Sequence, residues 1–121
     1  MTGEAQRVIE QFWHIQDAGD YTKLAPLFAE DAVLDDPIYG RFEGRSAILE
    51  FMTMMVNEMS ERKITFTLDE VCGDDHAAWA RWTMHSPAGT RGGVGVYKVE
   101  NGLMTYYRDY MDPEAETGET Q

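Results

Sequence analysis

Hydrophobic residues in the first half of the chain recur every three or four positions, which is the spacing of one face of an α-helix. This pattern predicts an amphipathic helix over Glu4–Ala18 that ends at Gly19. Its apolar positions are Ala5, Val8, Ile9, Phe12 and Ile15. A second, short helix is predicted to begin at Thr22, which serves as its N-cap. A third helix is predicted over Ser46–Met59, capped by its first residue.

The second half of the chain alternates apolar and polar residues with a period of two, which is the pattern of β-strands. Four strands are predicted between Ile64 and Met111, separated by the turn sequences GDDH, SPAGT and NG. Earlier, AVLDDPIYGRFEG predicts two short strands around a turn at Pro37, the second ending at Phe42. Helices followed by a meander of strands predict an α+β fold. We expect a curved antiparallel sheet that wraps around three N-terminal helices and encloses an apolar pocket.

The length and charge of the chain limit its organisation and its partners. Its 121 residues predict a single domain over residues 1–112, followed by an acidic tail at 113–121 that we expect to be disordered. A formal net charge of -12 disfavours nucleic acid and anionic membranes as partners. The chain shows neither a signal peptide nor an apolar run long enough to span a bilayer. With Cys72 as its only cysteine and three scattered histidines, we expect a cytoplasmic protein without disulfide, metal or cofactor.

Strand parity divides the side chains of the last strands between two faces, because neighbouring residues of a strand point to opposite sides. If Asp109 points inward, Tyr107 and Thr105 point inward as well. The residues expected on the outer face are Tyr106, Arg108 and Tyr110. On the neighbouring strand the expected inward set is Trp79, Arg81, Thr83 and His85. This arrangement predicts an ion pair between Asp109 and Arg81 inside the pocket.

Two aspartates are the main candidates for acid or base chemistry. Asp36, in LDDP, is either a turn-former that caps its own backbone or a general base at the mouth of the pocket. Asp109, in YRDY, forms a surface ion pair or, as we favour, lies in the pocket, where apolar neighbours favour a functional pKa. Arg81 either covers Trp82 with its stem or pairs with Asp109. His85 is a third candidate acid or base, with simple exposure at a strand end as the alternative.

Aromatic residues and methionines supply the expected walls of the pocket. The methionines of FMTMMVNEM are at helical spacing, so they are either core residues or a pocket wall suited to an irregular apolar ligand. The expected substrate-binding residues are Phe12, Trp13, Tyr39, Met52, Met55, Trp79, Thr83, His85 and Tyr107. The expected partner is therefore a small hydrophobic ligand.

The segment VIEQFWHIQDAGDYTKLAPLFAEDAVLDDPIYGRFEGRSAILEFM resembles the start of the nuclear transport factor 2-like superfamily. This superfamily includes ketosteroid isomerases, SnoaL-type polyketide cyclases and limonene-epoxide hydrolases. The motifs that carry the resemblance are AGD, LF.ED, DP and G..AI..F, and the likeness extends over about residues 5–112. It implies a cone-shaped α+β fold that is commonly dimeric through the outer face of its sheet, so we expect a homodimer. The same fold hosts enzymes, binding modules and assembly domains.

The resemblance to ketosteroid isomerases is centred on Asp36. In those enzymes the aspartate of the DP turn shuttles a proton, and Asp36 matches it. The two hydrogen-bond donors that stabilise the enolate do not match, because Phe12 stands at one position and Gly95 near the other. Tyr39 and Tyr107 are the candidate substitutes for these donors.

The closing sequence YYRDYMD instead resembles limonene-epoxide hydrolases, in which the corresponding aspartate activates water. Asp109 matches that aspartate, and Arg81 matches the arginine that positions the epoxide. Thr83 stands where a second aspartate is found in that family. Leu34 and Asp36 replace a tyrosine and an asparagine that bind water. Asp36 is then the candidate acid, provided that it shares a proton with Asp109.

Together these features predict a small-molecule enzyme of the isomerase or cyclase kind, acting on a steroid-, polyketide- or terpenoid-like substrate by proton transfer. In this hypothesis Asp36 and Asp109 transfer protons, and Arg81 orients Asp109. The alternatives are water addition of the limonene-epoxide hydrolase kind, or a non-catalytic module for ligand binding or dimerisation. A further alternative is a pocket that is filled by the side chains of Trp13, Trp79 and Tyr107.

Overall fold

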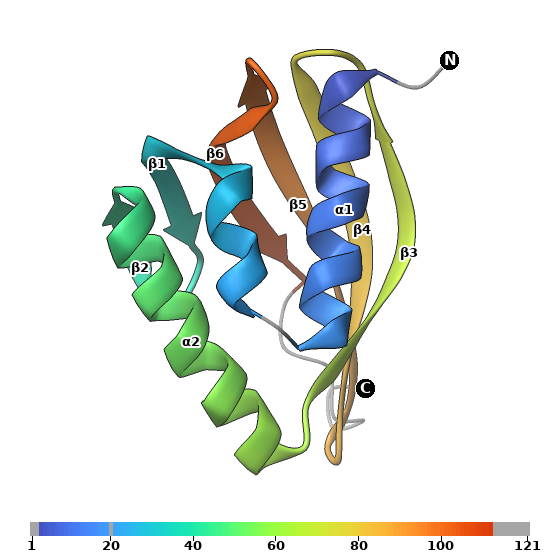
Figure 1. The fold of residues 1–121 in the computed structure, drawn as a ribbon. Coiled ribbons are helices and arrows are strands. Elements are labelled where there is room, and N and C mark those ends of the chain that lie inside the picture. The colour runs from blue at the N-terminus through green and yellow to red at the C-terminus, as the bar shows by residue number, and fades with distance from the viewer. Residues whose placement is uncertain (1–2, 20, 113–121) are drawn as a thin grey trace.

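The structure is a computed structural model that describes residues 3–19 and 21–112. Within these residues it has two α-helices, one 3-10 helix and a six-stranded sheet (Figure 1). The helices are α1 (Glu4–Ala18), η1 (Tyr21–Leu27) and α2 (Arg45–Arg62). The strands are β1 (Phe28–Asp36), β2 (Gly40–Glu43), β3 (Thr65–Gly73), β4 (Ala77–Ser86), β5 (Gly89–Glu100) and β6 (Leu103–Met111). The acidic segment 113–121 lies outside the described residues, and the domain boundary before it stays a prediction.

The first helix has the predicted bounds, whereas the other two differ from the prediction. α1 ends at Gly19, whose φ of 83° is a left-handed conformation that glycine adopts without strain. The second is a 3-10 helix that contains Pro26, a residue without the N–H that a longer α-helix needs. α2 begins at Arg45, and Gly44 is its N-cap, without a side-chain cap hydrogen bond, so Ser46 lies inside the first turn. No helix of the described part of the chain is both long and apolar enough to cross a membrane.

The sheet is mixed, and not antiparallel throughout as the sequence predicted. Its strand order is β2-β1-β6-β5-β4-β3. All neighbours are antiparallel except β1 and β6, which are parallel. The prediction is wrong for this pair because β1 connects to the later strands through β2 and α2. No tight turn therefore fixes its direction relative to β6.

The sheet curves around the helices, which cover one of its faces (Figure 1). Shifts of register interrupt the pairs β1–β6, β3–β4 and β5–β6, and such irregularities bend a sheet. The shift in β5–β6 also changes parity. Met104 pairs with Val99 and is buried, and Thr105 is the extra residue, donating a hydrogen bond to the carbonyl of Lys98 at 3.3 Å. The prediction that Thr105 faces inward with Tyr107 is therefore wrong.

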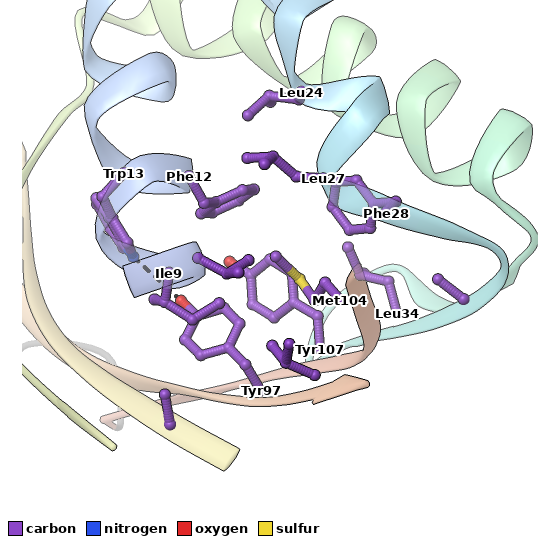
Figure 2. Packing of buried hydrophobic residues seen from close by; sticks show 14 of the residues in the cluster. Ile9, Phe12, Trp13, Leu24, Leu27, Phe28, Leu34, Tyr97, Met104 and Tyr107 are labelled. Carbon is purple, nitrogen blue, oxygen red and sulfur yellow. Dashed lines mark hydrogen bonds between the residues drawn. The ribbon is translucent and has the colours of Figure 1, made fainter. Parts of the chain in front are cut away.

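Aromatic rings from α1 and the sheet form the centre of the core (Figure 2). Phe12 has no exposed surface, and its ring meets those of Phe28 and Tyr107 edge-on at centroid distances of 6.0 Å and 5.6 Å. The rings of Tyr97 and Tyr107 lie 4.6 Å apart. Burying a side chain of this size stabilises the fold by about 2–3 kcal/mol. Phe12 is thus a core residue, and its predicted place in a substrate site is wrong because the helix turns it away from the cavity described below.

Candidate functional site

A cavity of about 620 Å³ lies between the helices and the inner face of the sheet. Its walls come from the end of α1, the β1–β2 turn, one side of α2 and the strands β3 to β6. Large apolar side chains dominate the lining, among them Trp13, Phe51, Met52, Met55, Phe66, Trp82, Met84 and Met111. This volume and this lining fall within the range of small-molecule sites.

Asp109 projects from β6 into the cavity. Across the sheet it lies opposite Gly95 of β5, which in turn lies opposite Ala80 of β4. A side chain at Gly95 would collide with the Tyr97 hydroxyl and come within 3.0 Å of Asp109 Oδ1. The glycine therefore leaves the space that both polar groups occupy.

The carboxyl group of Asp109 is the most perturbed acid of the cavity. Its Oδ1 is buried and has no hydrogen-bond partner among the described residues. Burial raises the pKa of Asp109 to about 7; the Tyr107 hydroxyl and the Trp82 indole oppose the rise, and the charge of Asp36 adds to it. Near neutral pH, Asp109 therefore carries a proton in a large share of the molecules.

A chain of polar groups leads from α1 to Asp109. The Trp13 indole N–H donates to the Tyr97 hydroxyl at 3.2 Å, as the dashed line in Figure 2 shows. The Tyr107 hydroxyl donates to Asp109 Oδ2 at 3.1 Å. Burial, and then the charge of Asp109, raise the pKa of both Tyr97 and Tyr107 well above their usual range. Both hydroxyls therefore stay protonated at any pH at which the protein works.

Asp36 shapes the turn after β1 and also lines the cavity. Its Oδ2 accepts hydrogen bonds from the backbone N–H groups of Ile38 at 2.9 Å and Tyr39 at 2.8 Å. These bonds are those of an aspartate that forms a turn. The Tyr39 hydroxyl donates to Glu58 Oε1 of α2 at 3.1 Å, which ties the turn to the helix. Asp36 therefore forms the turn and also lies at the edge of the cavity, so its two predicted positions are compatible.

The predicted inward set of β4 faces the wrong side of the sheet. Trp79, Arg81, Thr83 and His85 alternate with the residues that face the core, Ala78, Ala80, Trp82 and Met84. The reason is the register of two hairpins, which aligns Ala80, and not Arg81, with Gly95 and Asp109. None of the four outward residues lines the cavity.

The outward residues of β4 have partners on β3. The Arg81 guanidinium lies 3.3 Å from the carboxylate of Glu70 and 3.8 Å from that of Asp69. Thr83 donates to Asp69 at 2.6 Å, and the His85 ring lies 2.8 Å from the Thr67 hydroxyl. The predicted ion pair between Arg81 and Asp109 is therefore wrong, and these side chains stabilise the outer surface instead.

The cavity nevertheless brings together all of the remaining candidates. The predicted residues that line it are Trp13, Asp36, Tyr39, Met52, Met55, Tyr107 and Asp109. The lining residues that sequence reasoning missed include Phe66, Trp82, Met84, Arg91 and Met111. The signal that points to Trp82 is the pair of alanines that precedes it at alternate positions, because small residues at alternate positions mark a strand face that packs closely.

The outer face of β1 and β6 agrees with the prediction for Tyr106, Arg108 and Tyr110. Tyr106 donates to Asp35 Oδ2 at 2.6 Å, and Arg41 binds the same carboxylate through two nitrogens at 2.9 Å and 3.0 Å. The Arg41 bond and then the Tyr106 bond lower the pKa of Asp35 to about 2. The Arg108 guanidinium lies 4.8 Å from the ring centre of Tyr110. Asp35 is therefore a structural carboxylate, on the face away from the cavity.

The cavity is equipped for proton transfer by carboxyl and hydroxyl groups. Asp109 offers or accepts a proton near neutral pH, and the turn orients the Asp36 carboxylate toward the same space. In the part of the chain that the structure describes, no three or more His, Cys, Asp and Glu side chains gather in a way that could hold a metal ion.

Many solved structures share this fold. An NTF2-like protein of unknown function from Mesorhizobium loti has a TM-score of 0.78 at 21% identity, with 91% of this chain and 92% of that chain covered. A proposed ketosteroid isomerase from Kribbella flavida has a TM-score of 0.78 at 19% identity, with 93% and 81% covered. An LEH-like epoxide hydrolase from M. tuberculosis has a TM-score of 0.67 at 20% identity, with 90% and 83% covered. At these identities the likeness establishes the fold alone.

The family follows from the sequence match. No curated protein sequence matches the chain. The model of the SnoaL-like domain matches residues 9–107, which is most of the chain. Asp36 lies inside this range, and Asp109 follows two residues after its end. The predicted membership of the nuclear transport factor 2-like superfamily is confirmed, and the chain belongs to the family of SnoaL-like domains.

Proposed function

We propose that the protein is an enzyme that moves a proton within a hydrophobic small molecule, as isomerases and cyclases do. One observation carries the proposal: Asp36 and Asp109 line the same apolar cavity, and Asp109 Oδ1 is buried without a partner among the described residues. Two carboxyl groups that share a site rarely ionise together. One of them therefore holds a proton while the other can accept one.

Asp36 is the base in this proposal. The backbone N–H groups of Ile38 and Tyr39 hold its Oδ2, which fixes the carboxylate at the edge of the cavity. Asp36 takes a proton from a carbon next to a carbonyl group, so the C–H bond breaks and its electron pair forms the enolate. The same carboxyl group returns the proton to another carbon of the conjugated system. The double bond moves, and no atom is gained or lost.

Side chains of β6 supply the stabilisation that an enolate needs. The resemblance to ketosteroid isomerases leaves Phe12 at one donor position and Gly95 near the other. The Tyr107 ring packs edge-on against Phe12, and the Asp109 carboxyl group lies beside Gly95. In this proposal protonated Asp109, whose Oδ2 accepts the Tyr107 hydroxyl, donates to the enolate oxygen. A buried donor of this kind lowers the barrier by about 3 kcal/mol.

A panel of β,γ-unsaturated cyclic ketones tests the proposal. Conjugation of the double bond is followed by ultraviolet absorbance in D2O, and deuterium in the product by mass spectrometry. We expect Asp36→Asn to lower kcat by roughly a thousandfold and Asp109→Asn by roughly a hundredfold. Asp35→Asn is the matched control, because Asp35 lies on the outer face. Unchanged turnover in both cavity variants, or no turnover of any ketone by the wild type, would contradict the proposal.

Water addition to an epoxide is the second candidate. It is supported by the likeness to the LEH-like epoxide hydrolase and by the position of Asp109, which would take a proton from water while Asp36 protonates the epoxide oxygen. The outward direction of Arg81 weighs against it, since the arginine implied by the resemblance is then absent from the cavity. Transfer of ¹⁸O from labelled water into a diol would favour hydration over proton shuttling. Binding without turnover of either substrate class would instead support the non-catalytic module.

We also propose that the chain forms a homodimer through the outer face of its sheet. Trp79 and Tyr110 are 37% and 51% exposed there, and Arg108 stacks on Tyr110. Aromatic residues and arginine on an uncovered sheet face are typical of the centre of an interface. Analytical ultracentrifugation is expected to give a dimer for the wild type and a monomer for Trp79→Glu. A monomeric wild type at micromolar concentration would contradict this assembly.

A further inference from the structure

Arg91 brings a positive charge to the cavity side of the sheet, away from the two aspartates. It lies in β5 opposite Met84 of β4, and both residues line the cavity. Gly95, the residue opposite Asp109, follows four residues later on the same strand. At a rise of about 3.3 Å per residue, these two positions of β5 are about 13 Å apart. Arg91 and Asp109 therefore mark two polar points of one elongated cavity.

The backbone orients Arg91 and leaves most of its donors for a ligand. Its Nε donates to the carbonyl oxygen of Asp112 at 2.8 Å, and the Asp112 N–H donates to the carbonyl of Gly92 at 2.9 Å. The guanidinium has five N–H donors, and within residues 3–19 and 21–112 this is the one hydrogen bond that it makes. Its two terminal amino groups have no partner among the described residues, and their planar geometry suits a carboxylate.

The surface between the two polar points is apolar. Trp82, Met84 and Met111 line it, and Phe66 borders it from β3. Two other carboxylates border the cavity, but Glu58 already accepts the Tyr39 hydroxyl, and Asp17 is exposed at the end of α1, where water screens its charge. An apolar chain or ring system can thus lie between Arg91 and Asp109, and the other arginine of the lining, Arg62, is exposed at the end of α2.

We propose that the cavity takes an amphipathic anion, an apolar molecule whose carboxylate binds Arg91 while its reacting end lies at Asp109. The reacting end rests on the proposed function, whereas the anion site rests on the geometry of Arg91 alone. The net charge of -12 repels anions at a distance, so recognition of a carboxylate depends on a local positive charge, which Arg91 supplies at this end of the cavity. A neutral molecule of the same shape binds without the contribution of the Arg91 guanidinium.

A displacement assay tests the anion site. The neutral fluorophore N-phenyl-1-naphthylamine reports on the cavity, and decanoate and decanamide compete for it at a pH above neutral. We expect Arg91→Gln to weaken decanoate by about tenfold, the usual effect of losing a charge-assisted hydrogen bond, and to leave decanamide and the fluorophore within twofold. Arg91→Lys keeps the charge and is expected to retain most of the decanoate affinity. Arg81→Gln is the matched control, because it removes an arginine from the outer face.

Each outcome decides a separate question. Equal affinities of decanoate for the wild type and Arg91→Gln would overturn the anion site, and so would a parallel loss of decanamide, which would point to damage to the cavity itself. Because the assay measures binding, its result is independent of turnover. Selective loss of decanoate affinity in Arg91→Gln supports the anion site even if the ketone panel shows no proton transfer. If the panel shows proton transfer but Arg91→Gln binds decanoate as tightly as the wild type, the proposed chemistry stands without the anion site.

Discussion

Asp109→Asn is expected to stabilise the folded protein above neutral pH, although it removes a group from the candidate site. The pKa of Asp109 is about 7 in the folded protein, against a usual value of 3.8 that applies to the unfolded chain. Between pH 3.8 and about pH 7, Asp109 therefore holds a proton in the folded state that it has lost in the unfolded state. The free energy of unfolding of the wild type therefore falls with rising pH, by about 1.4 kcal/mol per unit. The whole loss approaches about 4 kcal/mol above pH 7, and asparagine avoids it.

Urea unfolding followed by tryptophan fluorescence measures this difference. Compared with the wild type, the variant is expected to be equally stable or up to about 2 kcal/mol less stable at about pH 4, and about 2–4 kcal/mol more stable by about pH 8. The lower figure allows for the buried amide that asparagine leaves without a partner. Other titrating groups cancel in the comparison, because both proteins carry them. A difference that does not change with pH would refute the reasoning, since Asp109 would then titrate alike in both states.

Three further predictions concern the supports of the site. Gly95→Ala is expected to destabilise the protein by about 1–3 kcal/mol in urea unfolding, because the new methyl group collides with the Tyr97 hydroxyl beside Asp109; wild-type stability would contradict that contact. Asp35→Asn is expected to destabilise it by about 1 kcal/mol at neutral pH. Because the pKa of Asp35 is lowered to about 2, this difference should shrink as the pH falls from about 4 towards 2, and urea titrations at acidic pH check the trend. Phe12→Ala is expected to cost about 3–5 kcal/mol in thermal or urea unfolding, whereas Ile38→Ala, at a side chain that is 65% exposed, should cost less than about 1 kcal/mol; similar losses would argue against a core role for Phe12.

The sequence predicted those features that depend on one element at a time. The spacing of apolar residues and Gly19 were enough for α1, because both act within a single helix. Parity within β6 was enough to separate Arg108 from Asp109, because neighbours on one strand must face opposite sides. The aspartate of the DP turn was found as a candidate because its turn chemistry is local.

Features that depend on several elements were predicted less well. Whether Arg81 or Ala80 aligns with Asp109 depends on the register of two hairpins. Because β4 carries a tryptophan on each face, the alanines before Trp82 were the one signal within the strand. A helix face does not reveal whether Phe12 meets the core or a cavity, because both are apolar. The parallel pairing of β1 with β6 follows a long connection that has no turn signal. Arg91 was missed for the same reason as Trp82, since its face is set by partners on other strands.

The pKa of Asp109 is the quantity on which the proposed chemistry most directly depends. A ¹³C NMR titration of its carboxyl carbon, in the wild type and in Asp36→Asn, measures this pKa and its coupling to the second aspartate. A pKa near 7 in the wild type, and a lower one when the Asp36 charge is removed, is the result that we predict. A wild-type pKa near 4, unchanged in Asp36→Asn, would show that the two carboxyl groups do not share a desolvated cavity and would contradict the proposed proton transfer.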